Sequence, residues 1–113
     1  MNIIGDVKNR DVILVDDEIN TGGSMVHAVE ILKNHGAREI YMFFIHPVLS
    51  GTASDRLCSL PVKKFVTTNT IPLTEKKKAC FGDRLEVLSI GPMLGEVIKR
   101  ANEGRSVGAM FNE

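Results

Sequence analysis

The chain has 113 residues, 43% of them hydrophobic and 25% charged, which suits one globular domain that buries roughly 65% of its unfolded surface. Fourteen Lys and Arg residues balance 14 Asp and Glu residues, so the overall charge favours neither nucleic acid nor an anionic membrane as a partner. The sequence shows no charged-then-apolar leader and no apolar run of about 18 residues, and we therefore expect a cytoplasmic protein.

The central stretch of the sequence is an apolar run followed by two acids and a glycine turn. Residues 12–15 predict a buried strand of a parallel sheet, and Asp16 and Asp17 mark the point where it reaches the surface. The turn, residues 21–24, offers backbone N–H groups and hydroxyls at the start of a helix. These parts fit a sugar phosphate, because the N–H groups bind phosphate while carboxylates accept bonds from hydroxyls or share a divalent metal.

An apolar strand that ends in two acids is also typical of the receiver domains of response regulators. A receiver domain needs a phosphorylatable Asp at the end of a later strand, but the next predicted strand, residues 39–45, ends in His46 and Pro47. A receiver domain would also leave the Thr-Gly-Gly-Ser turn unexplained. The combination of acids and glycine turn therefore favours phosphate binding.

The helix after the turn carries an apolar stripe and can end at Gly36. A strand, a helix and a second strand of these lengths predict a right-handed parallel crossover. Ligands of open α/β sheets bind at the carboxyl ends of the strands, which places His46 and Ser50 near the glycine turn. For His46 both a functional and a structural role remain open.

The second half of the chain predicts three further elements and a tail. We expect a short helix over residues 52–59, a strand over 63–67 and a last strand over 85–90. Pro92 then opens a helix whose buried face is formed by Leu94, Val97, Ile98 and Ala101. Three apolar tail residues suggest docking on another domain or subunit: Val107, Met110 and Phe111.

Some polar segments of the second half fit two interpretations. Residues 68–70 follow the third strand and either approach a ligand or form a turn. The charge run 75–78 predicts a solvated loop, with phosphate binding as the weaker alternative. Cys58 and Cys80 are far apart in sequence and lack the spacing of metal ligands, so we expect buried or half-buried thiols.

Residues 12–24 resemble the ribose-phosphate-binding signature of type I phosphoribosyltransferase folds: an aliphatic strand, two acids and Thr-Gly-Gly-Ser. Four later segments narrow the resemblance to the ribose-phosphate pyrophosphokinase family, also called phosphoribosyl-pyrophosphate synthetases. They are residues 44–51, 66–73, 88–94 and 103–107. The resemblance runs from about residue 5 to residue 111, and it covers only the carboxy-terminal portion of that much longer family.

The resemblance implies an α/β fold with a mostly parallel sheet and flanking helices, in which residues 1–113 are incomplete without an amino-terminal partner domain. It implies transfer of diphosphate from ATP to ribose 5-phosphate, giving phosphoribosyl pyrophosphate and AMP, with Mg²⁺ as cofactor. Asp16 and Asp17 would hold the ribose hydroxyls or share the Mg²⁺. The residues that would hold the 5-phosphate are Asn20, Thr21, Gly22, Gly23 and Ser24. The family more often has Asp in place of Asn20, and the change removes a negative charge beside the phosphate.

The resemblance also implies what this chain needs from elsewhere. The ATP site belongs to the absent amino-terminal portion, so we identify no catalytic residue here and expect the chain alone to be inactive. The family forms homo-oligomers in which the tail helps to line an allosteric site, and Ser106 and Val107 match that segment. Gly108 stands where a second Ser is common in the family.

Two other functions use the same signature. A base-specific phosphoribosyltransferase would need a hood over a purine or pyrimidine, and no segment after the last predicted helix suggests one. A non-catalytic regulatory homologue would bind ligand or partner without turnover. The sequence upstream of this segment discriminates between the synthetase and the regulatory homologue, because only the synthetase retains the residues of the ATP site.

Overall fold

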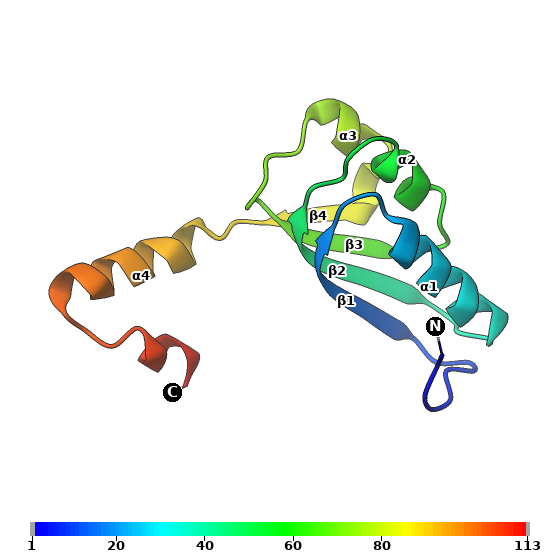
Figure 1. The fold of residues 1–113 in the computed structure, drawn as a ribbon, viewed down its shortest axis with the longest axis horizontal. Coiled ribbons are helices and arrows are strands. Elements are labelled where there is room, and N and C mark those ends of the chain that lie inside the picture. The colour runs from blue at the N-terminus through cyan, green and yellow to red at the C-terminus, as the bar shows by residue number, and fades with distance from the viewer. Residues whose placement is uncertain (1, 113) are drawn as a thin grey trace.

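The computed structural model describes residues 2–112, in which four strands form one parallel sheet (Figure 1). The strand order β1-β2-β3-β4 makes each strand a neighbour of the next one in the chain. The strands are β1 (Val12–Ile19), β2 (Ile40–Pro47), β3 (Lys64–Thr68) and β4 (Leu85–Leu88). This architecture confirms the predicted α/β fold with a parallel sheet and flanking helices.

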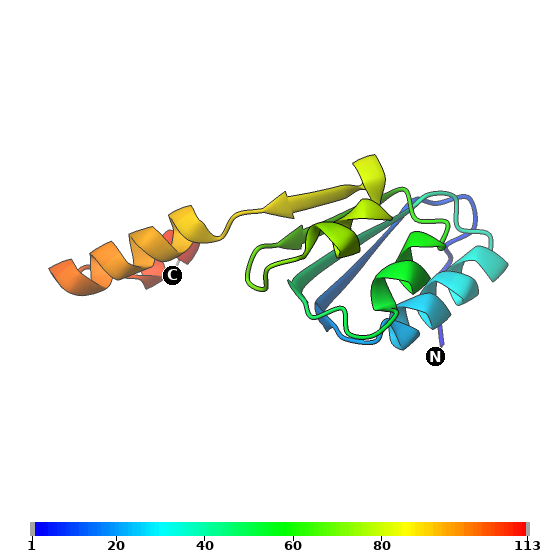
Figure 2. The same ribbon diagram turned by 90° about the horizontal axis from the view of Figure 1, so that it is seen from above.

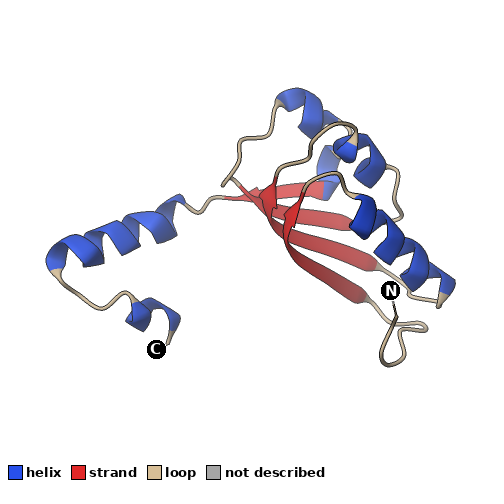
Figure 3. Cartoon of the chain, in the orientation of Figure 1, coloured by secondary structure: helices blue, strands red, loops and turns tan. Residues whose placement is uncertain are grey.

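Helices alternate with the strands along the chain (Figure 3). They are α1 (Gly23–Asn34), α2 (Ala53–Cys58), α3 (Glu75–Ala79) and α4 (Gly91–Glu103), with two 3-10 helices at Gly82–Arg84 and Gly108–Phe111. Figure 2 shows α1, α2 and α3 on one side of the sheet, whereas α4 projects beyond β4. Within residues 2–112, no helix combines the length and apolar character that crossing a membrane requires.

The hydrophobic core lies between the sheet and helices α1 to α3. The largest side chains that it buries completely include Phe44, Phe65, Phe81, Ile40 and Met42. Successive side chains of a strand point to opposite faces of the sheet, so the residues between the core positions lie on the other face. That face is open to solvent in this chain: two of its apolar side chains, Ile13 and Val15, are 62% and 73% exposed.

The predicted buried face of the last helix is wrong. The helix itself forms, with Pro92 in its first turn and Gly104 in the left-handed conformation at its end. However, no residue of α4 is buried, and Leu94 and Ile98 are 45% and 69% exposed, because α4 extends away from the sheet (Figure 1). An amphipathic pattern predicts that a helix has an apolar face, but it does not identify the surface that covers this face.

Two local predictions in the second half are also wrong. The charge run forms helix α3 instead of a loop, because Thr74 caps it by accepting a hydrogen bond from the N–H of Lys77 at 3.2 Å. Cys58 and Cys80 are not free thiols: they form a disulfide with their Cα atoms 5.9 Å apart. The bond joins the end of α2 to the end of α3 across 22 residues, a proximity that sequence spacing could not show.

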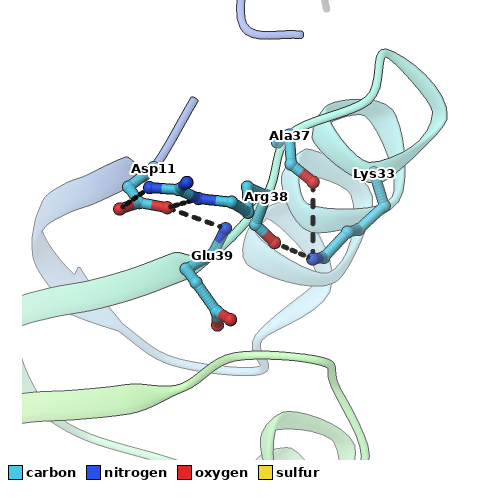
Figure 4. Close-up of polar contacts among 5 residues, drawn as sticks. All are labelled: Asp11, Lys33, Ala37, Arg38 and Glu39. Atoms are coloured by element: carbon cyan, nitrogen blue, oxygen red, sulfur yellow. Dashed lines mark hydrogen bonds and ion pairs between the residues drawn. The ribbon is translucent and has the colours of Figure 1, made fainter. Parts of the chain in front are cut away.

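The amino-terminal edge of the β1-β2 pair is tied by an ion pair (Figure 4). Both guanidinium nitrogens of Arg38 that face Asp11 lie 2.8 Å from its carboxylate oxygens, and the N–H of Glu39 donates to the same carboxylate at 3.2 Å. The hydrogen bond with Arg38 lowers the pKa of Asp11 to about 2. Lys33 in turn donates to the carbonyl of Arg38 at 2.5 Å. The contacts join the end of α1 to the strands at the edge opposite the glycine turn.

Arg84 organises the segment between α2 and β3. Its guanidinium donates to three backbone carbonyls, those of Cys58 at 2.6 Å, Val62 at 3.1 Å and Leu60 at 3.3 Å. It also lies 5.4 Å from the centre of the Phe65 ring, within the range of a cation–π contact. One side chain therefore donates to three backbone carbonyls of the segment that leads from α2 to β3.

Replacing Arg84 with methionine is expected to lower the free energy of unfolding by about 2–3 kcal/mol, because several half-buried carbonyls lose a charged donor. The change retains most of the apolar stem, so packing on Phe65 is largely kept. Urea denaturation followed by circular dichroism measures the effect. The matched control is Arg105→Met, since Arg105 forms an exposed ion pair with Glu103 at 3.0 Å near the tail. Equal stability of the two variants would contradict the assigned role of Arg84.

Candidate functional site

The candidate site lies at the carboxyl edge of the sheet, in the loop that joins β1 to α1. β1 is longer than predicted: it continues through the acids to Ile19, because Glu18 pairs with His46 and Ile19 with Pro47 of β2. The acids therefore belong to the strand itself and not to the loop. Residues 20–22 then make the turn into α1.

Gly22 allows this turn. Its φ of 85° and ψ of −2° lie in the left-handed region, which other L residues rarely adopt. It is the N-cap of α1, and among residues 2–112 no side chain makes a capping bond to this terminus. Since the first N–H groups of a helix have no intrahelical acceptor, those at the start of α1 are available to an anion.

A cavity of about 190 Å³ opens at this terminus. Its lining comprises Asp16, Glu18, Ile19, Asn20, Thr21, Gly22, Gly23, Ser24 and Met25. It therefore brings together every residue that the resemblance assigns to ribose 5-phosphate except Asp17, and it adds Glu18, which the sequence analysis did not single out. Two carboxylates and the positive end of α1 thus face one small space.

Asp16 and Asp17 differ in position and in environment. Asp16 is half-buried and lines the cavity, whereas Asp17 is exposed and does not. A hydrogen bond with Asp16 lowers the pKa of Asp17, as do the N–H of Glu18, which donates to it at 2.8 Å, and the positive charge that His46 can carry. Asp17 is therefore a carboxylate at neutral pH, beside the cavity and not inside it.

The acids fit a magnesium ion only in part. Mg²⁺ binds through one or two carboxylates together with water and substrate oxygens, and Asp16 and Asp17 could supply that share. No group of three or more acidic, histidine or cysteine side chains in the described chain is arranged to hold a metal. Any Mg²⁺ here would thus depend on ligand oxygens as much as on the protein.

The loop between β2 and α2 supports the glycine turn. The N–H of Leu49 donates to the carbonyl of Ile19 at 2.9 Å, and the N–H of Ser50 donates to that of Asn20 at the same distance. The Ser50 hydroxyl also donates to Asn20 Oδ1 at 2.5 Å. The expectation that Ser50 lies near the site is confirmed. Only its place at the end of a strand indicated this.

A second support comes from α2. Arg56 of this helix reaches toward the turn, so that its Nη1 lies 3.5 Å from the carbonyl of Thr21. Ala53 and Leu57 of the same helix lie against Gly22, where a Cβ atom would be 3.9 Å and 3.8 Å away. The turn is therefore held from behind by a packed helix.

Other candidate residues are brought to the same edge or lie elsewhere. His46 is at the edge, where its Nδ1 lies 2.9 Å from Thr70 Oγ1. The hydroxyls of Thr68 and Thr70 donate to the carbonyl of Ile45, which supports the turn interpretation of residues 68–70. Ser106 lies beyond α4, where its hydroxyl accepts from the N–H of Ala109, and Val107 follows it. Neither Ser106 nor Val107 lines the cavity.

The parallel sheet and the N-terminus of α1 place the chain among α/β proteins with a candidate anion site at the carboxyl edge of the sheet. The family model described as "Phosphoribosyl synthetase-associated domain" matches residues 1–112. The chain belongs to this family of phosphoribosyl synthetase-associated domains.

Curated relatives and a solved structure agree with this assignment. The chain is 51% identical over 111 residues to "Ribose-phosphate pyrophosphokinase" of Caldanaerobacter subterraneus subsp. tengcongensis, covering 98% of this chain and 34% of the relative. It is 42% identical over 112 residues to the protein of the same name from Bacillus subtilis, with 99% and 34% covered. It is also similar to the crystal structure of phosphoribosylpyrophosphate synthetase from Mycobacterium smegmatis, at 40% identity and a TM-score of 0.84, over 89% of this chain and 33% of that one. The chain thus spans about a third of the length of these relatives.

Proposed function

We propose that this chain is the ribose 5-phosphate-binding, carboxy-terminal portion of an enzyme that transfers diphosphate from ATP to ribose 5-phosphate. The observation that supports this most strongly is the cavity at the start of α1, where a phosphate-binding terminus and the Asp16 carboxylate face one space. The names of the relatives support the reaction, and the family resemblance of the sequence supports the carboxy-terminal assignment.

In this proposal the two ends of the sugar phosphate bind to different parts of the site. The 5-phosphate accepts hydrogen bonds from the backbone N–H groups and hydroxyls of residues 20–24, aided by the helix dipole. Asp16 accepts from a ribose hydroxyl, and Asp17 joins it when the sugar or a Mg²⁺ bridges the two carboxylates. The chemistry is chiefly positioning and charge neutralisation.

The rest of the enzyme supplies what this portion lacks. ATP binds through the amino-terminal portion, and the assembly is a cytoplasmic homo-oligomer. The surfaces left open here, the outer face of the sheet and the apolar stripe of α4, are consistent with further protein contacts. In that assembly Ser106 and Val107 contribute to an allosteric site.

Replacing Asp16 and Asp17 together with asparagine is expected to weaken ribose 5-phosphate binding about tenfold or more, because charged acceptors of the ribose hydroxyls are lost. Calorimetric titration at constant ionic strength measures it. The single Asp16→Asn variant should account for most of the loss, since Asp16 alone of the pair lines the cavity.

Asp83→Asn is the matched control for the carboxylate pair. Asp83 lies in the 3-10 helix before β4, at the opposite edge of the sheet, and is exposed. This variant should bind like the parent, and thermal melts should show that all three variants fold. Undiminished binding by the double variant would mean that the carboxylates are structural.

A further inference from the structure

The disulfide joins two short helices that lie on the same face of the sheet (Figure 1). Cys58 is the last residue of α2 and is half-buried, whereas Cys80 follows α3 and is exposed. A thiolate in solution opens a disulfide by attacking one of its sulfurs, so the bond must be within reach of solvent. The exposed position of Cys80 gives such a thiolate access to the bond.

Helix α3 depends on this bond for its attachment to the domain. None of its five residues, Glu75–Ala79, is buried, and a helix of this length is not stable on its own in water. On either side of it, Leu73 is half-buried against the core and Phe81 is fully buried. The flanking residues therefore keep the chain in place when the bond opens, while the helix between them is free to unfold.

The other helix of the pair, α2, supports the turn at the candidate site. A Cβ atom at Gly22 would lie 3.8 Å from Leu57, and Arg56 Nη1 lies 3.5 Å from the carbonyl of Thr21. Because α2 has only six residues, its order also depends on contacts with its neighbours. Its end is held by the disulfide and by Arg84, whose Nη2 donates to the carbonyl of the last residue at 2.6 Å. Opening the bond removes one of these contacts and loosens the support of the turn.

A disulfide is unusual in the compartment proposed for this protein. The cytoplasm keeps thiols reduced, and the disulfides that occur there are usually catalytic or respond to the redox state. Exposed disulfides also exchange with thiols more readily than those sealed in a core. Both arguments favour a bond that opens and closes over a permanent crosslink.

We propose that Cys58 and Cys80 form a reversible redox site, whose reduction by a dithiol releases α3 and weakens the binding of ribose 5-phosphate. The inference rests on the proposed function, because it assumes that the cavity at the start of α1 binds this ligand. It adds a modification site outside the cavity and a means of regulating the affinity.

The reaction is a thiol–disulfide exchange in two steps. A thiolate of the dithiol attacks Cys80 Sγ, and the bond between the two cysteine sulfurs breaks, so that Cys58 leaves as a thiolate. The second thiolate of the reductant then attacks the mixed disulfide and releases Cys80. The dithiol is oxidised to a disulfide, and its two electrons and two protons pass to the cysteine sulfurs, which become thiols. A disulfide oxidant reverses the reaction.

The test compares the oxidised full chain with the chain in excess dithiothreitol, the probe dithiol, by NMR at neutral pH. Reduction should lower the backbone order parameters of residues 75–79 below about 0.6, while those of β2 stay near about 0.85. The affinity for ribose 5-phosphate should fall about threefold or more, because a smaller fraction of the chain then has the supported turn. Oxidised glutathione, added after the reductant has been removed, should restore both properties.

Cysteine variants control for other effects of the reductant. The double variant Cys58→Ser and Cys80→Ser lacks the bond, so it should have a mobile α3 and the lower affinity with or without dithiothreitol. Cys80→Ala is the second variant, because it retains the half-buried Cys58 that packs against the core. Measured in dithiothreitol, it should match the reduced parent.

The outcomes separate this inference from the function on which it rests. The inference is overturned if the bond resists dithiothreitol in the folded chain, if the whole chain unfolds on reduction, or if the bond opens without weakening ribose 5-phosphate binding. The first two results would identify a permanent structural crosslink. No binding by either form would overturn the proposed function instead. The order parameters of residues 75–79 are measured without ligand, so unchanged values on reduction would overturn the redox site in that case too.

Discussion

Replacing Gly23 with valine is expected to weaken ribose 5-phosphate binding at least about 100-fold, equivalent to about 2.7 kcal/mol of binding free energy. Gly23 is the first residue of α1 and lines the cavity. A Cβ atom at Gly23 would have only Thr21 Oγ1 within 4 Å, at 3.9 Å, so the valine meets no wall of the protein. Its methyl groups would instead take space that the phosphate needs beside the free N–H groups.

The same geometry predicts that Gly23→Val folds, which separates it from a change at Gly22. Gly22 has a φ of 85°, so a valine there would strain the backbone and could unfold the turn. Gly95→Val is the matched control, because Gly95 lies in α4 with nothing within 4 Å of an added Cβ. It should bind like the parent in calorimetric titrations.

A lysine variant tests whether the phosphate site has been placed in the right part of the chain. Lys77 belongs to the basic run of α3, which is capped by Thr74 and does not line the cavity. Lys77→Ala should retain parental affinity for ribose 5-phosphate. Loss of binding in Lys77→Ala comparable to that in Gly23→Val would place the phosphate outside the turn.

The sequence predicted the sheet well because short segments of sequence are enough to locate each strand. Apolar runs bounded by turn residues identified every strand, and Gly36 and Gly104, both with positive φ, were correctly placed at helix ends. The end of β1 was missed because its last residues are polar. Pairing with β2, shown by Glu18 beside His46, keeps them in the strand.

The site was predictable in its loop but not in its surroundings. Residue type alone indicated the Thr-Gly-Gly-Ser turn of the candidate site, whereas Glu18 enters the cavity through the strand extension just described. Ser50 lies 30 residues from Asn20, and only the parallel crossover brings the two together. The Cys58–Cys80 bond and the exposed stripe of α4 likewise depend on packing that spacing does not encode.

The chain alone is expected not to make phosphoribosyl pyrophosphate, and restoring the amino-terminal portion is expected to give turnover. Within residues 2–112 the only turn at a helix terminus that we propose to bind phosphate is the one assigned to the 5-phosphate. The sugar hydroxyl could be held, but nothing would orient the diphosphoryl donor. Orientation of two reactants can account for about 7–11 kcal/mol of a barrier.

The measurement is AMP release from ATP that depends on both ribose 5-phosphate and Mg²⁺, first with the purified chain and then with the amino-terminal portion restored. Gly23→Val in the restored protein is the matched control, because it should bind ATP yet release no AMP for want of an acceptor. Substantial turnover by the short chain would refute this division of labour. If neither protein releases AMP although both bind ribose 5-phosphate, a regulatory homologue would be favoured. The cavity would then bind its ligand without any turnover.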